Sequence, residues 1–295
     1  MPIDLPYFDV LLDRLEQNHP ELTTAFGRHV HWGYWGNADR ADGSMTNFAQ
    51  AAERMTRRVL ACAGIENGQR VLDVGSGFGG TVASLNEQFD DVSLTGLNID
   101  ARQIARARRR VRPRSGNVIQ FREGDACQMP FDDDSFDTVI ALECAFHFPS
   151  RLRFLAEAHR VLRPGGRLAV ADFVPTRWLV PFLKAQGLVL GGYVKHVLGP
   201  ADVSFTIERY RQTAKEQGLL LAATDDITEG TLPTYPVLRK VAVEMNLHQR
   251  TARFGVNTLE WASRAKLLRY VILTFEKEVS RVEAEPVQEP LSGAV

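Results

Sequence analysis

From residue 70 onward, short apolar segments alternate with longer segments whose apolar residues recur every three to four positions. The short segments have the length and composition of buried strands, and the longer ones have the periodicity of amphipathic helices. Strands that alternate with helices are joined by right-handed crossovers and form a doubly wound parallel sheet. The predicted strands are residues 71–74, 93–97, 118–123, 138–142 and 168–173, and the predicted helices are residues 80–89, 101–111 and 150–162.

The chain on either side of this region follows other patterns. Arg163-Pro164-Gly165-Gly166 predicts the end of one helix and a turn into a strand. Residues 175–215 are apolar and mostly helical, which predicts an inserted helical cap. The remaining predictions are helices within 8–64 (clearest over 8–15 and 48–63) and over 235–248, and strands over 219–222, 225–228 and 270–275.

These elements divide the chain into three parts. We expect a helical or lid-forming segment over 1–66 and an α/β domain with its cap over 67–283. Residues 284–295 contain proline, glutamate and serine, and they predict a disordered tail.

Composition is that of an ordinary globular protein. The 295 residues are 44% hydrophobic and 24% charged, and the net charge of −1 gives no reason to expect a nucleic-acid partner. Cys62, Cys127 and Cys144 have no metal-site spacing and fit reduced thiols in a cytoplasmic protein. The first residues lack a signal-peptide pattern, and charged residues interrupt the apolar stretch 178–199, so we expect no membrane insertion.

The sequence Val-Leu-Asp-Val-Gly-Ser-Gly-Phe-Gly-Gly over 71–80 is the most informative motif. A strand that turns sharply into a helix, with bare backbone close to a ligand, needs glycines such as Gly75, Gly77 and Gly79. Two classes of ligand are compatible with this motif, and a third possibility is a glycine-rich turn that binds no ligand. The spacing is also that of a dinucleotide site, as in an NAD-dependent oxidoreductase, but Asp73 would repel a pyrophosphate. The same carboxylate attracts the ammonium and sulfonium groups of S-adenosylmethionine (SAM).

Polar residues follow the next two strands, where ligands bind in open α/β sheets. Asn98 is placed to bind ribose hydroxyls, with Asp100 as the cap of the following helix. Asp125 is placed to accept from an adenine amino group, while the backbone of Ala126 reaches the ring; the alternative for Asp125 is a turn residue.

The fourth strand is followed by the best candidates for catalysis. His147 is a general base by its position, although a lone histidine is also a common structural group. Glu143 is placed to bind a substrate hydroxyl, to orient another group or to contact the cofactor.

Two further segments have two interpretations each. Residues 31–36, His-Trp-Gly-Tyr-Trp-Gly, predict either a lid that excludes water or a packed corner, and the two glycines favour the lid. The arginines between 106 and 114 indicate a solvated helix end more than a nucleic-acid surface.

The chain resembles class I SAM-dependent methyltransferases of the Rossmann-like, seven-stranded type. The resemblance rests on three motifs in order, which are residues 72–80, residues 124–137 and residues 161–166. It is closest to the small-molecule branch. The aromatic segment with Tyr34 is similar to tocopherol and natural-product enzymes, and Asn98 with Gln103 is similar to sterol C-methyltransferases, since most of the family carries an acid at position 98. Residues 143–147 resemble sugar, polyketide and glycolipid O-methyltransferases, in some of which the histidine is the proposed base.

The resemblance implies methyl transfer from SAM to a small, apolar secondary metabolite or lipid-like acceptor. It implies O-methylation with His147 as base and Glu143 in support, with C-methylation of an alkene as the alternative. A non-catalytic SAM-binding module is disfavoured because both residues are present. The cofactor-binding residues would be Asp73, Gly75, Gly77, Gly79, Asn98, Gln103, Asp125, Ala126 and Tyr34. We expect no metal, and we leave open whether the chain forms a homodimer.

Overall fold

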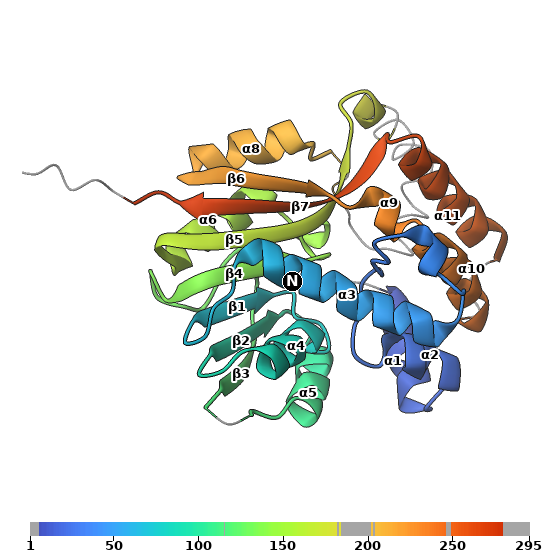
Figure 1. Ribbon diagram of the computed structural model, residues 1–295, viewed down its shortest axis with the longest axis horizontal. Helices are drawn as coiled ribbons and strands as arrows, with labels where there is room; N and C mark the ends of the chain where they lie inside the picture. The colour runs from blue at the N-terminus through green and yellow to red at the C-terminus, as the bar shows by residue number, and fades with distance from the viewer. Residues whose placement is uncertain are drawn as a thin grey trace, which may run out of the picture.

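A computed structural model describes residues 6–114, 116–181, 183, 202, 204–245 and 249–279. Its centre is a seven-stranded sheet of order β3-β2-β1-β4-β5-β7-β6, in which β7 is antiparallel to both of its neighbours. Figure 1 shows these strands in sequence from β6 at the top to β3 at the bottom. The predicted doubly wound, mostly parallel sheet is therefore confirmed. The strands are β1 Arg70–Val74, β2 Ser93–Asn98, β3 Val118–Glu123, β4 Phe136–Leu142, β5 Leu162–Pro175, β6 Leu219–Asp226 and β7 Leu268–Lys277.

Helices cover both faces of the sheet, because alternate residues of each strand point to opposite sides. On β4, Val139 packs in the core beneath α6 and α8, whereas Ile140 packs in the core beneath α3, α4 and α5. These helices are α3 Met45–Ala63, α4 Gly80–Gln88, α5 Ala101–Arg110, α6 Arg151–Val161 and α8 Ile207–Glu216.

A third core joins the two ends of the chain. Helices α1 (Pro6–Glu16) and α2 (Pro20–Phe26) pack with the start of α3 and with α10 (Thr234–Glu244). Figure 1 shows this group at one end of the sheet, beside α11 (Gln249–Arg264). The remaining short helices are η1 Ala38–Arg40, η2 Ala145–His147 and α9 Thr228–Thr231.

Several predicted boundaries need correction. The strands expected over 219–222 and 225–228 are one strand, β6, with a register shift between Leu221 and Ala223. The helix expected to 248 ends at Glu244, α2 lies within the segment 8–64 that was predicted to be helical, and α11 was not predicted. Of the expected cap, residues 182, 184–201 and 203 lie outside the described residues, and α8 covers β6 instead. The expected tail also lies outside them.

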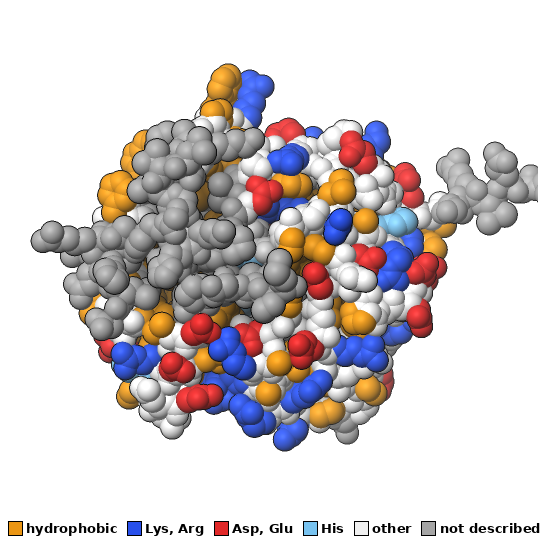
Figure 2. All heavy atoms as spheres, turned by 180° about the vertical axis from the view of Figure 1, so that it is seen from behind, with side chains coloured by type: hydrophobic (Ala, Val, Ile, Leu, Met, Phe, Trp, Pro, Cys, Tyr) orange, Lys and Arg blue, Asp and Glu red, His pale blue; other side chains and the backbone are white. Residues whose placement is uncertain are grey.

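The arginines over 108–114 are exposed at the end of α5 and just after it, as expected of a solvated helix end, and Arg106 is the exception. Arg106 is buried with its guanidinium over the ring of Phe78, and Arg108 donates to the carbonyl of Phe121. Figure 2 shows acidic and basic side chains interspersed over the described part of the opposite face. No described helix is long and apolar enough to cross a membrane.

Candidate active site

One pocket lies at the carboxyl ends of β1, β2 and β4, where ligands bind in sheets of this kind. The N-terminal segment that precedes α3 closes its other side. The pocket brings together Asp73, Gly75, Gly77, Asn98, Gln103, Glu143 and His147, all predicted from the sequence. The full lining is residues 8, 28–31, 73, 75–78, 80, 81, 98–100, 102, 103, 142–144, 147 and 148.

The glycine loop connects β1 to α4 in a conformation that other residues rarely adopt. Gly75 has φ +67°, and a Cβ atom there would lie 2.5 Å from the Cβ atom of Cys144. Gly79 has φ +80° and lies outside the lining, where a Cβ atom would lie 2.9 Å from the ring of Phe121. Gly75 therefore keeps the pocket wall tight, whereas Gly79 allows α4 to pack closely on the sheet.

Asp73 ends the apolar part of β1 and lines the pocket. Its side chain is buried, and its Oδ2 atom has no hydrogen-bond partner among the described residues. Burial raises the pKa of Asp73 to about 8, because a carboxylate in a poorly solvated site is costly. A cationic ligand group would satisfy this carboxylate.

Glu143 directly follows β4 and has φ +53°, a conformation uncommon for a residue with a side chain. Its carboxylate accepts from the backbone N–H of Trp32 at 3.0 Å and from the hydroxyl of Tyr270 at 2.6 Å. Burial raises the pKa of Glu143 to about 8, and the nearby charge of Asp172 acts in the same direction. Glu143 thus connects both ends of the chain to the pocket.

The end of β2 carries a small network of amides. The side chain of Asn98 donates to Gln103 at 3.0 Å, and both line the pocket. Asp100 accepts from the backbone of Arg102 and begins α5, as predicted. Asn98 and Gln103 therefore present neutral hydrogen-bonding groups rather than a carboxylate.

His147 lies in the short helix η2, after β4, and is half-buried. Its ring lies 4.1 Å, centroid to centroid, from that of Phe146. Phe146 in turn packs on Phe173, which packs edge-to-face on Trp32. These three half-buried rings, of Trp32, Phe146 and Phe173, form a continuous aromatic surface that begins beside His147. We refer to these three residues as the aromatic wall.

The expected lid is a packed segment in this structure. Trp35 is 1% exposed, and Trp32 contacts the ring of Tyr235. Gly33 is required by this packing, since a Cβ atom there would lie 2.7 Å from both Ala51 and Trp35.

Like Gly79, three other residues predicted to bind the cofactor do not line the pocket. Tyr34 packs against Gly230, where a Cβ atom would lie 2.3 Å from its ring. Asp125 accepts from the backbone of Cys127 at 2.8 Å, as a turn residue does, and Ala126 is in the core beneath α6.

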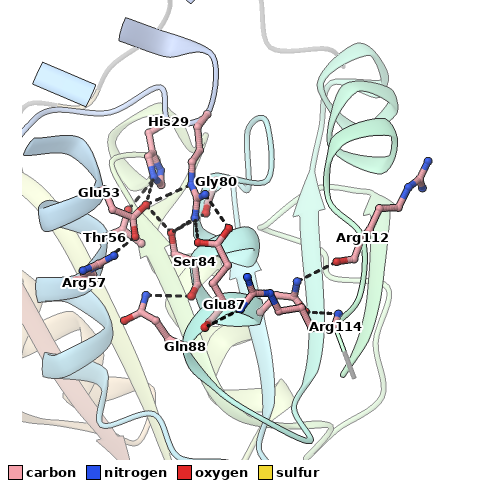
Figure 3. A network of polar contacts seen from close by, with 12 residues as sticks. His29, Glu53, Thr56, Arg57, Gly80, Ser84, Glu87, Gln88, Arg112 and Arg114 are labelled. Carbon is pink, nitrogen blue, oxygen red and sulfur yellow. Dashed lines mark hydrogen bonds and ion pairs between the residues drawn. The ribbon is translucent and has the colours of Figure 1, made fainter. Parts of the chain in front are cut away.

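A polar network behind the pocket was not predicted. His29 contacts Glu53 at 2.8 Å and lies 3.2 Å from His31, which also contacts Thr56. Figure 3 shows Glu53 between His29 and Ser84. Burial lowers the pKa of His31 to about 3, so this histidine is neutral near pH 7. No local motif indicates this network, because its members come from separate segments of the chain.

Comparisons with known proteins agree with this site. A methyltransferase domain family matches residues 72–170, which include the glycine loop, Glu143 and His147. The chain is 35% identical over 227 residues to Methyltransferase GfsG of Streptomyces halstedii, with 77% of this chain and 78% of the relative covered. It is 31% identical over 281 residues to 27-O-demethylrifamycin SV methyltransferase of Amycolatopsis mediterranei, with 92% and 95% covered.

This chain belongs to the class I SAM-dependent methyltransferases of small molecules. The fold is also that of geranyl diphosphate C-methyltransferase from Streptomyces coelicolor A3(2), whose structure contains Mg²⁺, geranyl diphosphate and S-adenosyl-L-homocysteine. The TM-score is 0.68 at 18% identity, with 94% of this chain and 99% of that chain covered.

The methyltransferase uses SAM, and the described residues fit this cofactor. The buried Oδ2 of Asp73 lacks a partner that a ligand ammonium would supply. The family and the relatives named above are methyltransferases, so the oxidoreductase alternative is wrong. Within the described residues, no group of three or more histidine, cysteine or acidic side chains is placed to hold a metal ion.

Proposed function

We propose that this methyltransferase methylates a hydroxyl group of an apolar natural product or lipid-like molecule, with His147 as the general base. The observation that carries this proposal is that His147 lines the same pocket as the unpartnered carboxylate of Asp73. A base next to a site for the methyl donor is the arrangement that proton removal during methyl transfer requires.

Asp73 and the glycine loop would hold the methionine part of the cofactor, and Asn98 with Gln103 the ribose. SAM supplies an electrophilic methyl group. Because that group is already activated, the protein has to align the acceptor, exclude water and take one proton. Alignment contributes up to about 7–11 kcal/mol in favourable intramolecular reactions.

The aromatic wall supports an apolar acceptor. Trp32, Phe146 and Phe173 are half-buried and extend from His147 through Phe146, so their exposed surface would suit an apolar partner. The name of the rifamycin relative indicates O-methylation of a natural product by a similar chain.

His147 would accept the hydroxyl proton as the oxygen attacks the methyl carbon. Glu143 lines the same pocket, and its carboxylate would favour the positively charged imidazole ring that results. We place Glu143 as a supporting group because both of its recorded contacts, to Trp32 and Tyr270, are made with neutral donors.

C-methylation of an alkene is the second candidate, favoured by one observation. Aromatic faces stabilise cations, and the aromatic wall begins at Phe146 beside His147, so it would stabilise a carbocation formed on that side of the pocket. The test is incubation of the purified protein with SAM and a panel of apolar acceptors, some with hydroxyls and some with alkenes only. A product that gains one methyl group and loses a free hydroxyl supports O-methylation. A methylated product with its hydroxyl intact, or turnover of the alkenes only, contradicts it.

A further inference from the structure

Two carboxyl groups line the pocket without a cationic partner in the described part of the chain. Asp73 is buried, and its Oδ2 atom has no hydrogen-bond partner there. Glu143 is half-buried, and both of its donors, Trp32 N–H and Tyr270 O–H, are neutral. A carboxylate held away from water without a positive partner is costly. A ligand that brings positive charge is therefore favoured at both carboxyls.

The arginines of the lining are already paired with other acids. Arg28 forms an ion pair with Glu87 at 2.8 Å. Arg102 forms ion pairs with Asp9 and Asp100, each at 2.8 Å. Neither arginine is available to neutralise the two carboxyls inside the pocket.

Titratable groups from every neighbouring element face Glu143. Asp172 is ion-paired with Arg151 at 2.9 Å, and His31 is neutral near pH 7. His147 lines the same pocket, so it is kept intact in every arm of the test below. The full set around Glu143 is Asp73 of β1, Cys144 beside it, His147 of η2, Asp172 of β5, Tyr270 of β7 and His31 of the N-terminal segment.

SAM carries two cationic groups, an ammonium and a sulfonium, whereas S-adenosylhomocysteine keeps only the ammonium. We propose that Asp73 and Glu143 together neutralise the two cations of SAM, so that SAM binding releases one more proton from the protein than S-adenosylhomocysteine binding does. The proposal rests on the cofactor site proposed above. Once methyl transfer has removed the sulfonium and His147 has released its proton, the second carboxylate has no cation, so it takes up a proton and the product is held less tightly.

The charge states give the size of the effect. Burial raises the pKa of Asp73 and of Glu143 to about 8, so at pH 7 each carboxyl of the ligand-free protein is protonated in roughly nine molecules of ten. A bound cation lowers these pKa values, and the protons leave for the buffer. The affinity for SAM relative to S-adenosylhomocysteine should therefore rise with pH from 6 to 8, by about 50-fold for one extra proton.

The experiment is calorimetric titration of the full chain with each ligand at pH 7, in two buffers that differ in ionisation enthalpy. The difference in heat between buffers gives the number of protons released. We expect SAM to release about 0.9 proton more than S-adenosylhomocysteine does. Glu143→Gln should abolish this excess, and the comparison of variant with wild type cancels the titration of the ligands themselves.

Each outcome decides a different point. Equal proton release by the two ligands in the wild type overturns the proposal, and so does an excess that persists in Glu143→Gln. If neither ligand binds, the proposed cofactor site fails instead. If Glu143→Gln does not fold, the pH dependence of the two wild-type dissociation constants still decides, because parallel dependences would contradict the proposal.

Discussion

The hydroxyl of Tyr270 on β7 donates a 2.6 Å hydrogen bond to Glu143, the residue that follows β4. β5 lies between these two strands in the sheet, so the contact crosses the carboxyl end of β5. Tyr270 is 1% exposed and its ring packs on Phe173 of the aromatic wall. One tyrosine thus fixes both a pocket carboxyl and the surface proposed for the acceptor.

Tyr270→Phe is expected to raise the pKa of Glu143 further, because the hydroxyl donates to its charged form. The pH at which SAM affinity reaches its plateau should move upward, and stability should fall by about 0.5–1.5 kcal/mol. Titration of SAM across pH, with thermal unfolding, measures both. Tyr235→Phe is the matched control, since its hydroxyl contacts Ser263 instead. An unchanged pH profile in Tyr270→Phe would contradict the expectation.

His147→Ala is expected to lower turnover by about 10²–10⁴-fold, because it removes the proposed base. The dissociation constant of S-adenosylhomocysteine should change little, since the proposed cofactor contacts remain. Methyl transfer rates and calorimetry measure the two effects. His19→Ala, at a surface contact between α2 and Glu244, is the control. Full activity of His147→Ala would remove this residue from the role.

Asp73→Asn is expected to stabilise the ligand-free protein, and more at pH 8 than at pH 5. The native pKa of about 8 lies above the ordinary value of 3.8, so the stabilising effect of the protonated carboxyl is complete at low pH and is lost as the pH rises to 8. An amide does not pay this cost. Melting temperatures of the variant and the wild type at several pH values test whether the variant is more stable and whether the difference grows with pH. A variant destabilised equally at both pH values would refute it, and SAM affinity should be lost in either case.

Gly80→Ala is expected to weaken SAM binding and to destabilise the fold. A Cβ atom at this position would lie 2.6 Å from the backbone oxygen of Arg28 and 2.5 Å from Nδ1 of His29. The N-terminal segment would have to move away from the pocket. Gly255→Ala on α11 is the control, because nothing lies within 4 Å and alanine favours helix. Normal affinity in Gly80→Ala would show that the segment does not contribute.

Arg151→Ala is expected to cost about 3–5 kcal/mol of stability, because it leaves a buried charge unpaired. Arg151 is buried and contacts Asp172 at 2.9 Å and the hydroxyl of Tyr210 at 2.7 Å. Chemical denaturation measures the loss. Arg153→Ala, exposed on the same helix, should change stability by less than about 0.5 kcal/mol. A small effect at Arg151 would mean that Asp172 finds another partner.

The alternation of strands and helices followed from local periodicity, and so did the strand ends that carry Asp73, Asn98, Glu143 and His147. Parallel strands bring their carboxyl ends together, so residues distant in sequence could be placed in one pocket before the structure was known. Asp100 was also placed correctly, because helix caps are set by adjacent residues.

Features that depend on contacts between distant segments could not be predicted from the sequence. Gly33 suits a mobile loop by itself, and only the neighbouring Ala51 and Trp35 show that it is required for close contact. Asp125 follows a strand as a ligand-binding acid would, but its carboxylate accepts a hydrogen bond from the backbone N–H of Cys127. The network of His29, His31 and Glu53 joins side chains up to 24 positions apart, and local sequence carries no trace of it.

The position of β7 between β5 and β6 has a consequence for biosynthesis. Glu143 receives Trp32 from near the start of the chain and Tyr270 from near its end. A chain that has not yet added β7 to its sheet lacks the hydroxyl of Tyr270, which is one of the two hydrogen-bond donors to Glu143. The carboxyl group of Glu143 therefore has its full set of described contacts only after β7 has joined the sheet.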